Sequence, residues 1–217
     1  VFDDETNLLR GAAAARERMR MMALTTGSVT MANNGQSFSF DYGVTHKGNA
    51  ATAWSDHATS DPIEDIRVAR ETIQDETGAE ITRAMCDGAT WRDIRNNEAI
   101  AKKIFVLSNG VGAVSDRALR EYILEELGIE VMINDKRYAN ESGVATKYMP
   151  ANTFVMFPDG QLGTTWFGTP PAESDLMGGA VANVAITDTG VAVTTHQTVD
   201  PSFEMADQVY ILDTTAE

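Results

Sequence analysis

Residues 60–78 read SDPIEDIRVARETIQDETG and carry the signals of a helix from beginning to end. Asp61 is a favoured N-cap residue, and Pro62 suits the first helical position, where its nitrogen needs no intrahelical bond. Gly78 is the residue type that most often ends a helix in the left-handed conformation. Between these ends, apolar residues recur at helical spacing and form one face, made of Ile63, Ile66, Ala69 and Ile73. The stretch therefore predicts an amphipathic helix over residues 62–77.

Toward the C-terminus, residues 79–150 alternate between short apolar runs and helical patterns, which predicts mixed α/β structure. The predicted segments are, in order, a strand at 81–85, a helix at 90–104, a second apolar run at 104–107, a helix at 115–127 and a strand at 129–133. From residue 151 onward helix signals nearly vanish, and β-branched and aromatic residues predict strands instead. These strands are expected at 153–157, 190–195 and 208–212.

Residues 28–42 predict a β-hairpin. Phe38 and Phe40 alternate with serines, which is the two-residue period of a strand. Asn34-Gly35 between the two runs is the strongest short hairpin signal. Because the phenylalanines share one face, that face of the hairpin is expected to be apolar.

The other two N-terminal segments complete the fold prediction. Residues 7–24 are rich in alanine and methionine and predict a helix that Gly27 ends. Residues 43–60 lack helical or strand periodicity around a single Trp54 and are expected to be an extended loop. A helix and hairpin at the start, a mixed middle and a β-rich end together predict the α+β fold class.

The charge of the chain is large and unevenly spread. The chain has 217 residues, 43% of them hydrophobic, so it can bury a sizeable core. Its formal net charge of −15 makes it a poor general binder of nucleic acid or anionic membranes. Residues 151–217 hold nine acidic side chains and no lysine or arginine, whereas residues 10–20 hold four arginines against only Glu17. This asymmetry predicts an acidic β-rich surface that meets a basic partner, for which the first helix is a candidate.

The sequence contains no pattern typical of a membrane span or a signal peptide, and it has too few cysteines for a disulfide framework. No segment is apolar over the ~20 residues that span a bilayer, and none has the pattern of a signal peptide. Cys86 is the only cysteine, which excludes an internal disulfide and fits a reducing compartment. Because the chain begins at Val1 rather than Met, we expect that an upstream segment has been removed or left out.

Residues that commonly act in catalysis or bind metals and cofactors do not form a recognisable site in this sequence. The three histidines are His46, His57 and His196. Asp56-His57 with Asp61 offers too few ligands at diagnostic spacing for zinc or iron. Asn109–Gly112 lacks the third glycine of a dinucleotide loop and the lysine of a phosphate loop, and Cys86 lacks a paired histidine. We therefore predict no catalytic, cofactor-binding or metal site, and an assembly role is favoured.

Short motifs follow one another along nearly the whole chain. The earlier ones are Arg16-Glu17-Arg18, Leu24-Thr-Thr-Gly27, Phe40-Asp41-Tyr42-Gly43, Trp54-Ser-Asp56 and Asp61-Pro62-Ile63. The later ones are Thr77-Gly78, Pro158-Asp-Gly160, Leu162-Gly-Thr164, Gly168-Thr-Pro-Pro171 and Asp200-Pro201. In order and spacing they resemble the major capsid proteins of tailed bacteriophages, specifically the lambda-like major capsid protein E family.

The resemblance implies the Hong Kong phage capsid fold, which has a peripheral domain with a long spine helix, an axial domain and an extended hairpin called the E-loop. It implies an N-terminal helix at 1–27, an E-loop at 28–60, a peripheral domain at 61–78 and 166–217 that contains the spine helix, and an axial domain at 79–165. Family members have a longer N-terminal arm, which is absent here.

The resemblance also implies a function, namely a structural, non-enzymatic subunit of an icosahedral bacteriophage head that encloses double-stranded DNA. The implied partners are identical subunits in hexamers and pentamers, with scaffold, portal and decoration proteins, and DNA only by non-specific proximity. The implied location is the virion capsid, with assembly in the host cytoplasm. Three alternatives stay open: a protein nanocompartment, a tail structural protein, and an enzyme with a cryptic site around His57 or residues 109–112.

Candidate interface residues come from the basic helix, the hairpin and the loop after it. They are Arg16, Arg18, Arg20, Asn33, Asn34, Gly35, Phe38, Phe40, Lys47 and Trp54. The arginines are candidates because of their charge, and the phenylalanines because of the apolar face that they give the hairpin. Lys47 is the only lysine of the loop, and no crosslinking chemistry is assigned to it.

Overall fold

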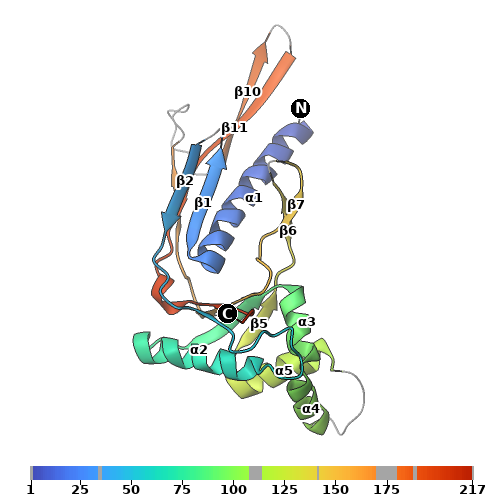
Figure 1. Cartoon of the computed structure of the whole chain (residues 1–217). Coiled ribbons are helices and arrows are strands. Elements are labelled where there is room, and N and C mark those ends of the chain that lie inside the picture. Colours follow the sequence, from blue (N-terminus) through green and yellow to red (C-terminus); the bar gives the residue numbers. More distant parts are fainter. Residues whose placement is uncertain are drawn as a thin grey trace.

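The computed structural model describes residues 2–33, 36–107, 114–140, 142–169, 180–187 and 190–216. Its elements form an elongated molecule with two parts, which Figure 1 shows one above the other. The lower part is built on a five-stranded sheet with helices, and the upper part on one long helix flanked by strands. This mixture of helices and sheets agrees with the predicted α+β class.

The sheet of the lower part joins strands from distant parts of the chain. Its strands are, in spatial order, β3 (Lys47–Asn49), β12 (Tyr210–Asp213), β8 (Thr153–Pro158), β4 (Ile81–Cys86) and β5 (Glu130–Ile133). β3 is parallel to β12 and β4 is parallel to β5, while β8 is antiparallel to both of its neighbours. β8 is buried along nearly its whole length, because it is the central strand and both of its faces are covered.

Four helices pack with this sheet around a first core. They are α2 (Pro62–Thr77), α3 (Gly88–Asn96), α4 (Glu98–Leu107) and α5 (Asp116–Leu127). The side chains of Asp61 and Ser115 accept hydrogen bonds from backbone N–H groups in the first turns of α2 and α5. Gly78 and Gly128 end these helices in the left-handed region, at φ of 72° and 68°. The helices predicted over 62–77 and 115–127 are therefore confirmed, the first of them with its predicted caps.

The opposite face of the sheet packs against the end of α1 (Phe2–Thr26). Successive side chains of a strand point to opposite faces. Accordingly, Phe154 and Met156 of β8 lie in the first core, whereas Val155 and Phe157 lie in a second core that also contains Met21 of α1. The sheet therefore separates two cores, and the second core joins the upper part to the lower.

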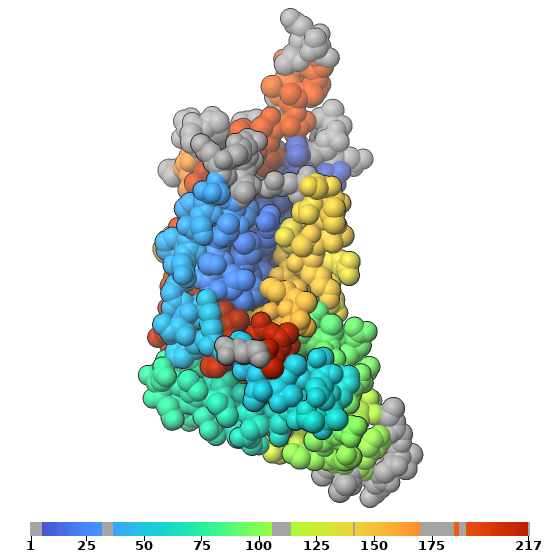
Figure 2. Space-filling view, viewed as in Figure 1, coloured from blue at the N-terminus to red at the C-terminus, as the bar shows by residue number. Residues whose placement is uncertain are grey.

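Antiparallel strands surround α1 in the upper part. They are the hairpin of β1 (Ser28–Asn33) and β2 (Gln36–Asp41), the pair β6 (Arg137–Ala139) and β7 (Ala145–Lys147), and a sheet of β10 (Ala180–Thr187), β11 (Gly190–Pro201) and β9 (Thr165–Gly168). Figure 2 shows the hairpin, α1 and the β6–β7 pair side by side on one face. A short 3₁₀-helix, Ala206–Gln208, precedes β12.

Most predicted strands are confirmed with shifts of one or two residues. The confirmed ones are the hairpin at 28–42 and the strands at 81–85, 129–133, 153–157 and 208–212. The strand predicted at 190–195 extends to Pro201, and the helix predicted at 7–24 extends from Phe2 to Thr26. The strands β6, β7, β9 and β10 were not predicted, because each of these segments is short or rich in small residues.

The helix predicted over 90–104 is two helices, because Asn97 interrupts it. The Asn97 side-chain amide donates to the backbone oxygen of Ser60 at 2.8 Å, and its Oδ1 accepts from the Ile100 N–H at 3.1 Å. Asn97 is only 1% exposed, so these bonds satisfy a polar side chain inside the core. The apolar run at 104–107 forms the end of α4.

The segment 43–60 is a loop, as expected, apart from the short strand β3, and it packs along the lower part. β3 is the edge strand beside β12, and the Trp54 N–H donates to the Thr214 oxygen at 2.9 Å. The boundary expected at residue 79 lies inside one core, because α2 packs against α5 and β4. Likewise β12, from the expected peripheral segment 166–217, pairs with β8.

Candidate subunit interface

The hairpin presents an apolar face that is only partly covered. The register pairs Met31 with Phe38 and Val29 with Phe40, so these four side chains share a face. Val29 is 3% exposed, whereas Phe38 and Phe40 are 61% and 50% exposed. Phe38 lines a groove of about 370 Å³ between the hairpin, α1 and β11. A large apolar area thus remains accessible on the upper part.

A second exposed aromatic pair lies on β9. Trp166 is 63% exposed and Phe167 is 44% exposed, opposite Asp200 and Val199 of β11. The Arg16 guanidinium lies 5.7 Å from the centre of the Phe167 ring, so Phe167 faces α1. Because neighbouring strand residues point to opposite faces, Trp166 projects from the outer face of the sheet. An exposed tryptophan of this kind is typical of an anchor residue in a protein–protein interface.

The three candidate arginines hold α1 against its own subunit. Arg16 donates to Oε1 of Gln197 on β11 at 3.0 Å, and Arg20 donates to Oγ1 of Thr165 on β9 at 2.9 Å. Arg18 lies on another side of the helix, 5.2 Å from the ring centre of Tyr138 on β6. In the described part of the chain, none of them pairs with a carboxylate. The expected contact between a basic helix and the β-rich segment is formed within the subunit, but through polar and aromatic partners.

The remaining candidates lie in different places. Asn33 ends β1, while Asn34 and Gly35 lie outside the described residues. Lys47 Nζ donates to the Thr26 backbone oxygen at 2.8 Å, at the end of α1. Trp54 is completely buried in the first core, so its assignment to an interface is wrong: the chain itself covers the whole side chain. Of the predicted residues, only Phe38 and Phe40 form an exposed apolar face.

Sequence reasoning missed Trp166 and Phe167, although a signal was present. Two consecutive aromatic residues in a strand must point to opposite faces, so both are buried only in a strand covered on both sides. The short TWFG run at Thr165–Gly168, followed by turn residues, had no second apolar layer predicted beside it. One exposed aromatic side chain could therefore have been expected.

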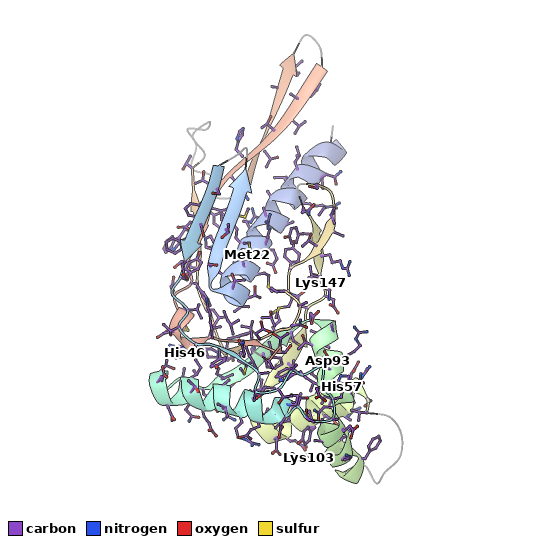
Figure 3. The ribbon with its side chains drawn as sticks, in the orientation of Figure 1. Met22, His46, His57, Asp93, Lys103 and Lys147 are labelled. Atoms are coloured by element: carbon purple, nitrogen blue, oxygen red, sulfur yellow. The ribbon has the colours of Figure 1, made fainter. Side chains whose placement is uncertain are left out.

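The candidate chemical groups are engaged in structural contacts. His57 Nε2 lies 3.0 Å from Oδ1 of Asp93 on α3, and both residues are labelled in Figure 3. Asp56 instead accepts from the N–H groups of Ala58 and Thr59, and Asp61 caps α2.

The other candidate groups also lie apart from one another. His46 Nε2 lies 2.9 Å from Oε2 of Glu76, while His196 lies on β11. The loop Asn109–Gly112 lies outside the described residues. Across the described ranges, no three His, Cys, Asp or Glu side chains are grouped so as to hold a metal ion.

Cys86 is expected to resist thiol reagents in the folded protein. Its side chain is 0% exposed, and burial raises the pKa of its thiol to about 12, so almost no thiolate exists at pH 8. A colorimetric thiol assay at pH 8 should detect no fast-reacting cysteine until denaturant is added. Rapid labelling without denaturant, at the rate of an exposed thiol, would contradict the buried position.

The chain matches a family model and is similar to several solved structures. The model of phage major capsid protein E matches residues 1–201. No protein with a curated description matches the sequence. The fold is similar to that of a protein assigned as a prophage capsid protein from Escherichia coli CFT073, with a TM-score of 0.65 and 16% identity. It is also similar to a phage-related protein from Bordetella bronchiseptica RB50, with a TM-score of 0.60 and 14% identity.

The two solved structures are longer than this chain. They match 97% and 96% of it, and the match spans 65% of the length of each of those proteins. Within the described ranges, every helix is too short or too polar to span a lipid bilayer. The capsid fold implied by the sequence motifs is confirmed by these structural matches. Because the family model covers nearly the whole sequence, the chain belongs to the phage major capsid protein E family.

Proposed function

We propose that this chain is the shell-forming region of a bacteriophage head protein, which assembles with identical subunits into an icosahedral shell around double-stranded DNA. Membership of a capsid protein family supports a structural and non-enzymatic role. The observation that carries the proposal is the exposed apolar surface of the upper part, above all Trp166 at 63% exposure. Large apolar side chains are rarely left exposed unless a partner buries them, so contact with another subunit explains these exposed aromatic residues.

In this proposal the subunits form hexamers and pentamers, and the shell is the virion capsid, assembled in the host cytoplasm. Scaffold, portal and decoration proteins are its further partners. DNA is enclosed without a specific contact, which agrees with the net charge of −15. The division into an E-loop at 28–60 and an axial domain at 79–165 stays a prediction for the assembled shell.

Electron microscopy of the full-length protein, expressed with its neighbouring head genes, tests the proposal. Closed shells or isolated ring-shaped capsomers are the expected result. A packaged genome inside the shells distinguishes a phage head from a nanocompartment, which would enclose an enzyme. A discrete monomer at all protein concentrations would contradict the proposed function.

Replacing Trp166 with serine is expected to weaken assembly without weakening the fold. Its side chain is 63% exposed, so the free energy of unfolding should change by no more than ~0.5 kcal/mol. Loss of an interface anchor typically costs at least ~2 kcal/mol of binding free energy. Light scattering during assembly should therefore increase more slowly than for the wild type, or not at all.

Leu124→Ser is the matched control, because Leu124 is 52% exposed but lies on α5 in the lower part. It should assemble at the wild-type rate. If Trp166→Ser assembled normally, β9 would not be part of the subunit interface.

A further inference from the structure

A cleft between the start of α3 and the β6–β7 pair gathers positive charge. It has a volume of about 470 Å³ and is lined by Gly88, Ala89, Arg92, Asp135, Arg137 and Lys147. Lys147 Nζ lies 2.9 Å from both Oδ2 of Asp87 and Oδ1 of Asp135. Hydrogen bonds to Asp135 and Asp87 raise the pKa of Lys147, so it stays charged at neutral pH. This lysine is neutralised locally and holds β7 beside the start of α3.

The two arginines of the cleft have no such partner. Arg92 on α3 and Arg137 on β6 are both exposed. In the part of the chain that the structure describes, neither contacts a carboxylate, although most other arginines of the lower part do. Two unpaired guanidinium groups at one cleft are unusual in a chain with a net charge of −15. The cleft therefore has the charge to receive carboxylates from outside the chain.

The solvent face of α2 has the complementary character. Val68, Glu71 and Asp75 are exposed and follow one another at helical spacing, so they form a single stripe. Val68 is 52% exposed, and within the described ranges neither Glu71 nor Asp75 pairs with a cationic side chain. The stripe thus combines unpaired carboxylates with an exposed apolar side chain, Val68. A charged cleft would account for the carboxylates but not for the exposure of Val68.

The cleft and the stripe lie on different sides of the molecule. Figure 1 shows α2 extending to the lower left, whereas α3 and the β6–β7 pair lie on the right. One subunit cannot bring the two surfaces together by itself. A contact between two unlike surfaces of identical subunits is head-to-tail, and it closes into a ring when the rotation between subunits permits.

We propose that the cleft of one subunit receives the acidic stripe of α2 from a second copy of the chain, in a head-to-tail contact within a ring-shaped capsomer. The inference rests on the proposed function, since it names the surfaces through which identical subunits meet. A nucleic-acid phosphate is the other anion that two arginines could bind. The exposed carboxylates of the α2 stripe supply a complementary surface on the chain itself, so the second copy is favoured.

Charge reversal on each surface tests the contact in the full-length protein. The cleft variant is Arg92→Glu with Arg137→Glu, and the stripe variant is Glu71→Lys with Asp75→Lys. Each alone should lower the association rate about tenfold or more, because attraction becomes repulsion. An equimolar mixture should regain association, because the reversed cleft of one variant fits the reversed stripe of the other. This rescue occurs only between molecules, so it distinguishes the contact from a folding defect.

Lys102→Glu with Lys103→Glu is the matched control, since it changes the net charge as much as the cleft variant but on α4. It should associate like the wild type, and all variants should unfold at the wild-type temperature. Sedimentation velocity measures the association, and electron microscopy shows whether shells form.

Wild-type association of the cleft variant, or failure of the mixture to associate, would overturn the inference. A cleft variant that assembles normally but loses binding of a double-stranded DNA oligonucleotide would assign the cleft to phosphate instead. In either case wild-type shells would leave the proposed function standing, whereas a wild type without shells or capsomers would contradict that function itself.

Discussion

Replacing Trp54 with alanine is expected to lower the free energy of unfolding by about 3–5 kcal/mol. Trp54 is 0% exposed, and its ring packs edge-on against Phe154 with 5.4 Å between the centres. Its indole N–H also donates to Oδ2 of Asp65 on α2 at 2.8 Å. The substitution leaves a large cavity in the first core and removes the donor to Oδ2 of Asp65. Equilibrium unfolding in urea measures the loss.

Trp166→Ala is the matched control, because it removes the same atoms from a position that is 63% exposed. It should unfold within ~0.5 kcal/mol of the wild type. If the two variants lost equal stability, the buried position of Trp54 and the exposed position of Trp166 could not both be correct.

Replacing Asn97 with alanine is expected to lower the free energy of unfolding by about 2–4 kcal/mol. Two effects add: the Ile100 N–H in the first turn of α4 loses its acceptor, and the Ser60 backbone oxygen loses its donor. Both losses occur at a site that is 1% exposed, where water does not easily replace them. Thermal unfolding, monitored by circular dichroism, measures this loss as a lower unfolding temperature.

Asn96→Ala is the control for Asn97, since Asn96 is the preceding residue and is exposed at the end of α3. Its effect should not exceed ~0.5 kcal/mol. Equal and small effects of both substitutions would show that the junction of α3 and α4 does not depend on the buried amide.

Helix ends and the hairpin could be predicted because their causes are local. Asp61 caps α2 through an amide three residues away, and Gly78 ends it through its own backbone conformation. The register of the hairpin follows from the alternation of Phe38 and Phe40 with serines. Motif order along the chain also predicted the capsid family, which the family model confirms.

The interruption at Asn97 could not be predicted in the same way. Its apolar neighbours continue a helical pattern on both sides, so the periodicity indicates one helix over 90–104. What ends α3 there is a buried amide whose partner, Ser60, lies 37 residues earlier in the chain. No window of local sequence contains that bond.

The roles of the tryptophans and arginines depended on contacts between distant segments. Its place in the predicted loop made Trp54 a candidate for an interface, yet the packing of α2 and β8 buries it. Trp166 instead remains exposed on the outer face of its sheet. Likewise Arg16 and Arg20 meet side chains 181 and 145 residues away. The amino-acid order thus specified the ends of α2 and α5, the hairpin, the α+β class and the family, because short-range hydrogen bonds and periodicity determine them. Long-range packing alone established which side chains are covered and which remain available to a neighbour, because burial is a property of segments brought together from different parts of the chain.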